Sequence, residues 1–203
     1  MTFIEPTKEN INGLILAGGR SRRFNNQDKA LMPFNGTTLV EHAVDRLKKQ
    51  THSVLVSANR HFDFYQQRNI NYIEDKIADY AGPLAGIHAA LATNKTPWLV
   101  SIACDTPCFP KDYVSQLANA VISNNTLIAV ARSQNRLQNI SMLIHQSLFD
   151  SLDCYLKAGE RKAQIWLEQL QPSIVDFNQP EDSFFNINTE EQLQQMEHRN
   201  CDE

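Results

Sequence analysis

The chain has 203 residues, of which 42% are hydrophobic and 21% charged, as is typical of a globular protein with one buried core. The formal net charge of -4 argues against nucleic acid as the main partner, since nucleic-acid binders usually carry a basic excess. No apolar run approaches the roughly 20 residues of a membrane span, and residues 1–10 do not resemble a signal peptide. We therefore expect a cytoplasmic protein without a membrane partner, forming a single domain over residues 1–203 with frayed ends at 1–11 and 197–203.

The first half of the chain alternates apolar, β-branched runs with amphipathic ones. In chain order we expect a strand at 13–16, a helix at 38–50, a strand at 53–57, a short helix near 62–68, a strand at 71–74, a helix at 84–92 and a strand at 98–103. The strand at 98–103 is almost continuously apolar, which indicates burial on both faces.

The second half is less regular. We expect a helix from Pro110 to about residue 123, strands at 127–131 and 140–144, helices at 146–157 and 162–170, short extended pieces at 174–177 and 184–187, and a last helix from Thr189. The run Thr189-Glu-Glu-Gln has the pattern of a capping box.

This alternation predicts an α/β fold with a mainly parallel sheet and right-handed crossovers. Ligands of such sheets bind beyond the carboxyl ends of the strands, near a topological switch point. Residues that carry chemistry should therefore follow strands directly.

Four cysteines, at positions 104, 108, 154 and 201, match no zinc-binding spacing. Cys104 and Cys108 could form a redox or metal pair. We favour the alternative that both are reduced, small apolar side chains, because cytosolic thiols are normally reduced.

A glycine-rich turn with a basic loop follows the first predicted strand. Gly18 and Gly19 would let backbone N–H groups face a polyphosphate, and positive charge follows at Arg20, Arg22, Arg23 and Lys29. The segment is neither a Walker A loop nor Gly-x-Gly-x-x-Gly. The alternative is a solvated basic loop after a tight turn.

Two further segments follow predicted strands. In Asp79-Tyr-Ala-Gly82-Pro-Leu-Ala-Gly86, the glycines could admit a base or a ribose, or could simply form the loop before a helix. Asp105 ends the most apolar strand and is suited to hold Mg²⁺, which favours hard oxygen ligands. The alternative for Asp105 is a turn carboxylate before Pro107. Asp75 has the same two interpretations, as a ribose or base contact or as a turn residue.

Asn186 and Asn188 are two residues apart on a segment expected to be extended, so their side chains should point the same way. Their amides could orient a phosphate or a polar heterocycle. Asn188 could equally be an ordinary residue at a helix start. The histidines form no metal-binding spacing, and no Ser/His/Asp or Cys/His set is evident.

Together these motifs resemble the molybdenum cofactor guanylyltransferases over residues 12 to about 196. The residues that carry the resemblance are Leu16-Ala-Gly-Gly-Arg-Ser-Arg-Arg-Phe24 with Asp28-Lys29, Ala58-Asn-Arg-His61, Ile73-Glu-Asp75, Asp79 to Gly86, Cys104-Asp-Thr-Pro107, Ala158-Gly-Glu-Arg161 and Phe185-Asn-Ile-Asn-Thr189. The resemblance implies a Rossmann-like nucleotidyltransferase, a three-layer sandwich that transfers GMP from GTP to molybdopterin and releases pyrophosphate.

The resemblance also implies roles for individual residues. Catalysis would depend on Arg23, Lys29 and Asp105, and Asp105 would hold Mg²⁺, with Mn²⁺ as an alternative. GTP would contact Leu16, Ala17, Gly18, Gly19, Lys29, Ser57, Asp75, Gly82 and Asp105. Molybdopterin would lie on the side of Asn186 and Asn188, and molybdoenzymes or their chaperones would receive the product.

Three positions depart from the family pattern: Ser57 stands where Asn is frequent, Asn25-Asn26-Gln27 replaces a glycine-rich run, and Gln138-Asn139 replaces a His/Gln-Pro pair. Two alternatives stay open. One is an enzyme of the same fold that uses CTP or a sugar-phosphate acceptor, although such relatives more often have Leu-Ala-Ala-Gly at residues 16–19. The other is a non-catalytic carrier of nucleotide or cofactor.

Overall fold

The computed structural model describes residues 3–18, 28–75, 82–178, 183–197 and 201. Within these residues, seven strands form one sheet in the order β5–β4–β1–β6–β8–β7–β9. Their bounds are β1 Ile11–Leu16, β4 Ser53–Ser57, β5 Tyr72–Ile73, β6 Trp98–Ala103, β7 Ile128–Ser133, β8 Arg136–His145 and β9 Ser173–Asp176. Of these strands, β8 alone runs antiparallel to its neighbours, so the prediction of a mainly parallel sheet is confirmed.

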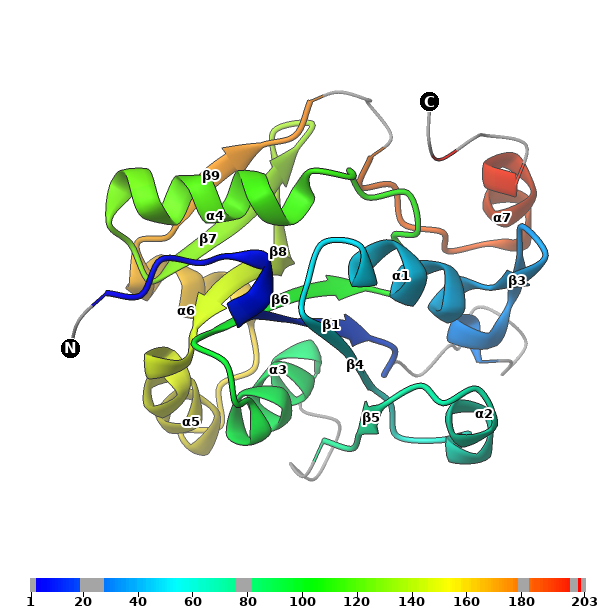
Figure 1. Ribbon diagram of the computed structural model, residues 1–203, viewed down its shortest axis with the longest axis horizontal. Helices are drawn as coiled ribbons and strands as arrows, with labels where there is room; N and C mark the ends of the chain where they lie inside the picture. The colour runs from blue at the N-terminus through cyan, green and yellow to red at the C-terminus, as the bar shows by residue number, and fades with distance from the viewer. Residues whose placement is uncertain (1–2, 19–27, 76–81, 179–182, 198–200, 202–203) are drawn as a thin grey trace.

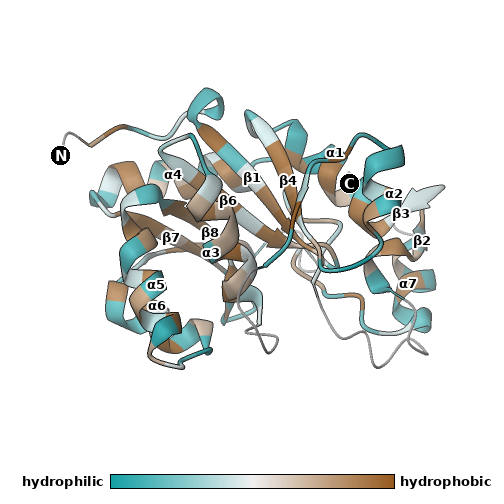
Figure 2. Ribbon diagram, turned by 90° about the horizontal axis from the view of Figure 1, so that it is seen from below, coloured by the Kyte–Doolittle hydropathy of each residue, from teal (hydrophilic) through white to brown (hydrophobic). Residues whose placement is uncertain are grey.

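Helices cover both faces of this sheet, which gives the expected three-layer sandwich (Figure 1). One face packs against α1 (Leu39–Lys48) and α4 (Tyr113–Asn124). The other face packs against α3 (Pro83–Thr93), α5 (Phe149–Lys157) and α6 (Ala163–Leu170). The central strands are the most apolar part of the ribbon, and polar residues lie on the outer sides of the helices (Figure 2).

The close approach of α1 to β1 depends on Gly13. A Cβ atom at this position would lie 2.6 Å from Leu47 Cδ2 and 3.2 Å from Thr51 Oγ1. The absence of a side chain at Gly13 therefore lets the apolar face of α1 lie directly on the middle of the sheet.

The topological switch point lies between β1 and β6. From β1 the chain continues to β4 and β5 on one side, and it returns to β6 on the other side of β1. The carboxyl ends of β1 and β6 therefore open onto a common crevice, where ligands of such sheets bind. Residues 17–18 and 104–106 follow these two ends.

A small hairpin of β2 (Pro33–Phe34) and β3 (Thr37–Thr38) was not expected from the sequence. Asn35 and Gly36 both have positive φ, as a two-residue hairpin turn requires. The last helix, α7 (Glu190–Glu197), packs against this hairpin through Phe34, Leu39, Ile187, Leu193 and Met196. Figure 2 shows α7 beside β2 at one end of the molecule. The C-terminal segment is thereby held near the switch point.

Several expected boundaries were wrong. Helix α4 begins at Tyr113 rather than at Pro110, because the chain first turns, with Tyr113 N donating to Pro110 O at 3.2 Å. In the piece expected to be extended at 184–187, Phe184 lies in a turn, and the piece joins no sheet. Residues 3–10, expected to fray, are anchored, since Trp98 Nε1 donates to Ile4 O at 2.8 Å and Lys8–Asn10 forms the short helix η1.

The other expected elements are present. The helix expected near 62–68 is α2 (Phe62–Gln67), and the helix expected at 146–157 is split into the short η3 (Gln146–Leu148) and α5. None of the helices in the described ranges has the length and hydropathy that crossing a bilayer would require.

The expectation of reduced thiols holds for Cys104 and is wrong for Cys108. Cys104 is free and buried, whereas Cys108 is disulfide-bonded to Cys201, which is 93 residues away in the chain. Spacing could not reveal this pair because it depends on where the C-terminal segment folds back. The disulfide joins the loop after β6 to the segment beyond α7.

Candidate functional site

Asp105 stands at the centre of the site, two residues beyond the end of β6. The loop that carries it is tied to both central strands, because Cys104 N donates to Leu16 O at 3.1 Å and Thr106 N donates to Ala103 O at 3.2 Å. Asp105 therefore lies at the switch point, as its position after the most apolar strand predicts.

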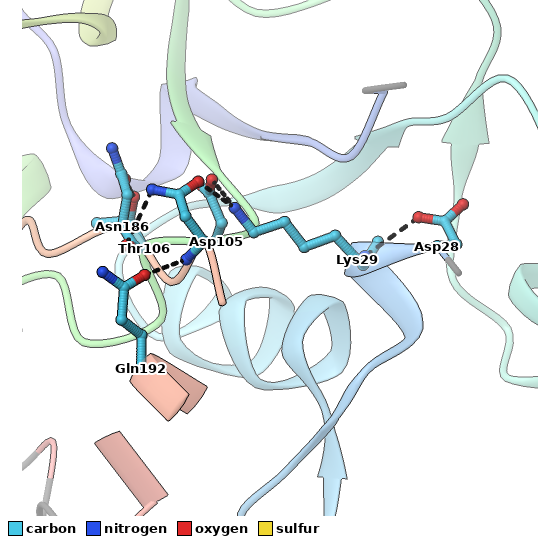
Figure 3. A network of polar contacts seen from close by, with 8 residues as sticks. Asp28, Lys29, Asp105, Thr106, Asn186 and Gln192 are labelled. Carbon is cyan, nitrogen blue, oxygen red and sulfur yellow. Dashed lines mark hydrogen bonds and ion pairs between the residues drawn. The ribbon is translucent and has the colours of Figure 1, made fainter. Parts of the chain in front are cut away.

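Lys29 reaches Asp105 from η2 (Lys29–Leu31). Its Nζ atom lies 2.6 Å from Asp105 Oδ2 and donates to Asn188 Oδ1 at 2.9 Å. Figure 3 shows the Lys29 side chain extending from beside Asp28 toward the Asp105 loop. Lys29 therefore contacts both Asp105 and Asn188. These three residues are far apart in the sequence, and all three were predicted to belong to one active site.

The second carboxylate oxygen of Asp105 is suited to a hard cation. Among the described residues, Asp105 Oδ1 is buried and has no hydrogen-bond partner. A buried, unpaired carboxylate oxygen is costly unless another group binds it. The described residues contain no cluster of three or more His, Cys, Asp or Glu that could hold a metal ion, so a bound cation would need waters or ligand oxygens as well. Mg²⁺ sites of one or two carboxylates plus substrate phosphates are of this kind.

Asn186 and Asn188 both contact residues around Asp105. Thr106 Oγ1 donates to Asn186 Oδ1 at 2.6 Å, and Ile187 N donates to Asp105 O at 2.9 Å. These bonds hold the segment before α7 along the Asp105 loop. A cavity of about 340 Å³ opens beside it, lined by Arg136 and Gln138 of β8 together with Phe185, Asn186, Asn188 and Gln192.

The capping box expected at Thr189 is only half formed. Gln192 N donates to Thr189 Oγ1 at 3.2 Å, as in a capping box. However, the Gln192 side chain accepts from Asn188 N at 2.6 Å rather than from the backbone of Thr189. The first turn of α7 therefore fixes the backbone of Asn188, whose side chain accepts a hydrogen bond from Lys29.

Asp75 lies at the other end of the crevice. Asn59 Nδ2 donates to Asp75 Oδ2 at 2.6 Å, and Asp75 N donates to Asn59 Oδ1 at 3.1 Å. A Cβ atom added to Gly18 would lie 3.6 Å from Asn59 Nδ2. Asp75, Asn59 and Gly18 thus form one group beyond the ends of β1, β4 and β5.

Ser57 and Gly86 pack against each other beneath this group. A Cβ atom at Gly86 would lie 2.5 Å from Ser57 Oγ and 2.9 Å from Leu16 Cδ2. Ser57 is 3% exposed, and its carbonyl accepts from Ala17 N at 2.9 Å. Ser57 and Leu16 therefore support the crevice from inside the protein, and Gly86 allows α3 to approach them.

Gly82 caps the N-terminus of α3 with a φ of 75°, in the left-handed region that favours glycine. Pro83 follows at the first helical position, as the sequence suggests. Gly19 and Arg23, two further predicted site residues, lie outside the described residues, as do Arg20, Arg22 and residues 79–81.

Three residues that hold the site together had no role predicted from the sequence: Asp28, Arg60 and Thr106. All three stand inside the motifs quoted for the resemblance, and that placement was the available signal. Cys104 is a poor nucleophile, because burial, and then the negative charge of Asp105, raises the pKa of its thiol well above the usual value and leaves little thiolate.

Comparison with known proteins agrees with this geometry. Residues 13–174 match the family model of the MobA-like NTP transferase domain. A molybdenum cofactor guanylyltransferase of Shewanella putrefaciens is 37% identical over 186 residues, which are 92% of this chain and 95% of the relative. One of Yersinia pseudotuberculosis is 41% identical over 180 residues, or 89% of this chain and 91% of the relative.

A solved structure is similar in fold. Molybdopterin-guanine dinucleotide biosynthesis protein A from Archaeoglobus fulgidus superposes with a TM-score of 0.72 at 21% identity, and the match covers 92% of this chain and 96% of that one. At this identity the match supports the fold alone, which is that of the three-layer sandwich described above.

Proposed function

From the premise that this chain belongs to the molybdenum cofactor guanylyltransferase family, we propose that it transfers GMP from GTP to the terminal phosphate of molybdopterin, free or already carrying molybdenum. It is a nucleotidyltransferase, as the resemblance implies. The observation that carries the proposal is the contact of Lys29 with Asp105 and Asn188 at the switch point, since it unites the three predicted functions of the site.

The reaction needs charge neutralisation and positioning rather than covalent catalysis. An oxygen of the acceptor phosphate forms a bond to the α-phosphorus of GTP, the bond to the bridging oxygen breaks, and pyrophosphate leaves with that electron pair. Both reactants are anionic, so the barrier includes bringing like charges together. The attacking oxygen is already ionised, and no general base is required.

Lys29 is the described cation best placed for this purpose. Its Nζ atom can move from Asp105 to a phosphate oxygen by rotation of its flexible side chain. We assign Arg23 the same neutralising function from the family pattern. Asp105 would hold Mg²⁺, or Mn²⁺ in its place, through Oδ1, the carboxylate oxygen that accepts no hydrogen bond from the described residues. When bound, the metal ion supplies positive charge to the phosphates.

The remaining contacts divide between two ends of the crevice. We assign the guanine and ribose to Ala17, Gly18, Gly19, Asp75 and Gly82. Leu16 and Ser57, which are buried, would shape this contact surface from beneath. We assign molybdopterin to the cavity beside Asn186 and Asn188, which has polar walls and is linked to Lys29 through the Asn188 side chain. The two substrates would then meet over Asp105.

The test is pyrophosphate release measured with molybdopterin and each of the four NTPs, using Asp105→Ala and, as a control, Asp150→Ala on the exposed surface of α5. We expect release with GTP only, abolished in Asp105→Ala and normal in Asp150→Ala. Pyrophosphate release with CTP would show that the enzyme uses CTP instead of GTP. Release with a sugar phosphate in place of molybdopterin would show that the acceptor is a sugar phosphate. Tight GTP binding without release would make the protein a carrier.

A further inference from the structure

We propose that Arg60 is a positioning residue, which acts on the reaction by holding Asp28 and, through it, Lys29. This inference rests on the proposed function, because it takes Lys29 to contact the phosphates of GTP. It concerns the segment Asn59–His61, which lies between the end of β4 and the start of α2.

Asp28 is a buried acceptor of several hydrogen bonds. Its side chain is 5% exposed, and its Oδ1 accepts from Ala30 N at 3.1 Å, which caps η2. Its Oδ2 accepts from Arg60 Nε at 2.6 Å, and His61 Nε2 lies 3.7 Å away. A carboxylate removed from water in this way requires an opposite charge, and Arg60 supplies it.

The cap formed by Asp28 fixes the position of the Lys29 backbone. Leu31 N donates to Asp28 O at 2.9 Å, and Met32 N donates to Lys29 O at 3.2 Å, so the turn is closed at both ends. Lys29 follows Asp28 directly, and its long side chain must reach Asp105 from this turn. A shift of the capping carboxylate would move the base of the Lys29 side chain, and errors of about 1 Å in a reacting group can reduce rates ~100-fold.

The same short segment also reaches the predicted nucleoside end of the crevice. Asn59, next to Arg60, exchanges two hydrogen bonds with Asp75. The segment is itself held firmly, because Ala58 N donates to Ile73 O at 3.0 Å and α2 is anchored by Tyr65, which is buried. The segment Asn59–Arg60 therefore holds two parts of the site: Asn59 holds Asp75 at the nucleoside end, and Arg60 holds Asp28, which precedes Lys29.

Arg60 is suited to a test because its own side chain is 41% exposed, so the loss of its packing should be small. The chain offers a matched control in Arg68, which is 40% exposed and whose Nε lies 2.7 Å from Glu41 Oε1. Both arginines form an ion pair with a carboxylate that caps a helix, but Arg68 does not contact the Lys29 turn.

The experiment is a double-mutant cycle of Arg60→Gln and Lys29→Met, read in both GTP affinity by calorimetry and kcat. We expect Arg60→Gln to lower kcat at least tenfold, Arg68→Gln to lower it less than twofold, and both variants to stay folded. In the Lys29→Met background, Arg60→Gln should have little further effect on either quantity, because its influence passes through Lys29.

Equal losses from Arg60→Gln in both backgrounds would overturn the proposal, as would a loss matched by Arg68→Gln. The cycle also separates this proposal from the proposed function. If the wild-type protein binds GTP but transfers no GMP to molybdopterin, the function fails, while the coupling of Arg60 to Lys29 is still decided by GTP affinity.

Discussion

Lys29 Nζ and Asp105 Oδ2 lie 2.6 Å apart, although 76 residues separate them in the chain. The pair joins the loop after β1 to the loop after β6, across the switch point of the sheet. Lys29 also donates to Asn188, which brings in the segment before α7. A single ammonium group thus connects the three parts of the chain to which we assign triphosphate, metal ion and acceptor.

Replacing Lys29 with Met should lower GTP turnover by roughly 100-fold or more, because the substitution removes the charge and keeps most of the side-chain volume. The measurement is steady-state pyrophosphate release at saturating molybdopterin, with thermal unfolding as a check on the fold. An unchanged rate would assign charge neutralisation to other residues. A control is Lys157→Met, since Lys157 pairs with Asp153 on the exposed surface of α5.

Gly18→Ala should test the preference for a purine nucleotide. Among the described residues, the added Cβ atom meets nothing closer than Asn59 Nδ2 at 3.6 Å, an ordinary van der Waals contact. We therefore expect unchanged thermal stability but weaker GTP binding, by about threefold or more, with CTP affected less. The measurement is the affinity for each nucleotide. Equal affinities before and after the change would remove Gly18 from the nucleotide contacts.

Gly86→Ala should destabilise the protein and weaken GTP binding together. The new Cβ atom would lie 2.5 Å from Ser57 Oγ and 2.9 Å from Leu16 Cδ2, and such overpacking typically lowers the free energy of unfolding by about 1–3 kcal/mol. Alanine favours helix by about 1 kcal/mol over glycine, which offsets part of the loss. Denaturant unfolding and GTP calorimetry would measure both effects.

The control for this substitution is Gly13→Ala, which crowds Leu47 at 2.6 Å. It should destabilise the fold without a specific effect on GTP. Adding Ser57→Ala to Gly86→Ala should recover part of the stability, because it removes the closest contact. If stability is not recovered, the clash of the new Cβ atom with Leu16, rather than with Ser57, causes the destabilisation.

The sequence predicted most strands and helices because each buries a recognisable apolar face. Trp98–Ala103 is a clear example, since all six residues match the predicted strand. The exceptions depend on distant contacts. Three of the four residues 184–187 are apolar, yet this piece joins no sheet: Ile187 packs against Phe34 and Leu193, and its N–H donates to Asp105 O.

The same distinction applies to the site. Lys29, Asp105 and Asn188 could be chosen from motif and strand position, and they lie in contact. Arg60 could not be assigned a role, because its side chain holds Asp28, and that partner is 32 residues away in the chain. The local sequence pattern does not show which distant side chain will form a hydrogen bond with a given residue.

Acid should weaken the start of α1 through Glu41. Burial raises the pKa of this carboxyl, but hydrogen bonds from Thr38 and Arg68 outweigh it, so the pKa lies below the ordinary value of 4.5. A lowered pKa in the folded protein means that the stabilisation is complete above pH 4.5 and is lost as the pH falls through the lowered value. Unfolding of Glu41→Gln and wild-type protein should therefore differ most near neutral pH, and converge in acid. A constant difference would contradict the assignment.

The cysteines should separate into three classes in a thiol titration without reductant. Cys154 is exposed and should react in the native protein. Cys104 is buried, and its raised thiol pKa leaves little thiolate, so it should react only after denaturation. Cys108 and Cys201 should react only after reduction. Two reactive thiols in denaturant, rising to four with reductant, is the expected result, whereas four without reductant would rule out the disulfide.

Cys201→Ser should then loosen α7 and, through Gln192, the backbone of Asn188. The disulfide closes a loop of 93 residues, and crosslinks of this span typically contribute about 2–5 kcal/mol to stability. Cys154→Ser is the matched control, because it removes an exposed thiol far from α7. We expect Cys201→Ser to lower the free energy of unfolding by this amount and to speed amide hydrogen exchange in residues 188–197 specifically. Faster exchange spread evenly over the whole sheet would mean that the disulfide stabilises the fold at large and does not hold the acceptor side of the site.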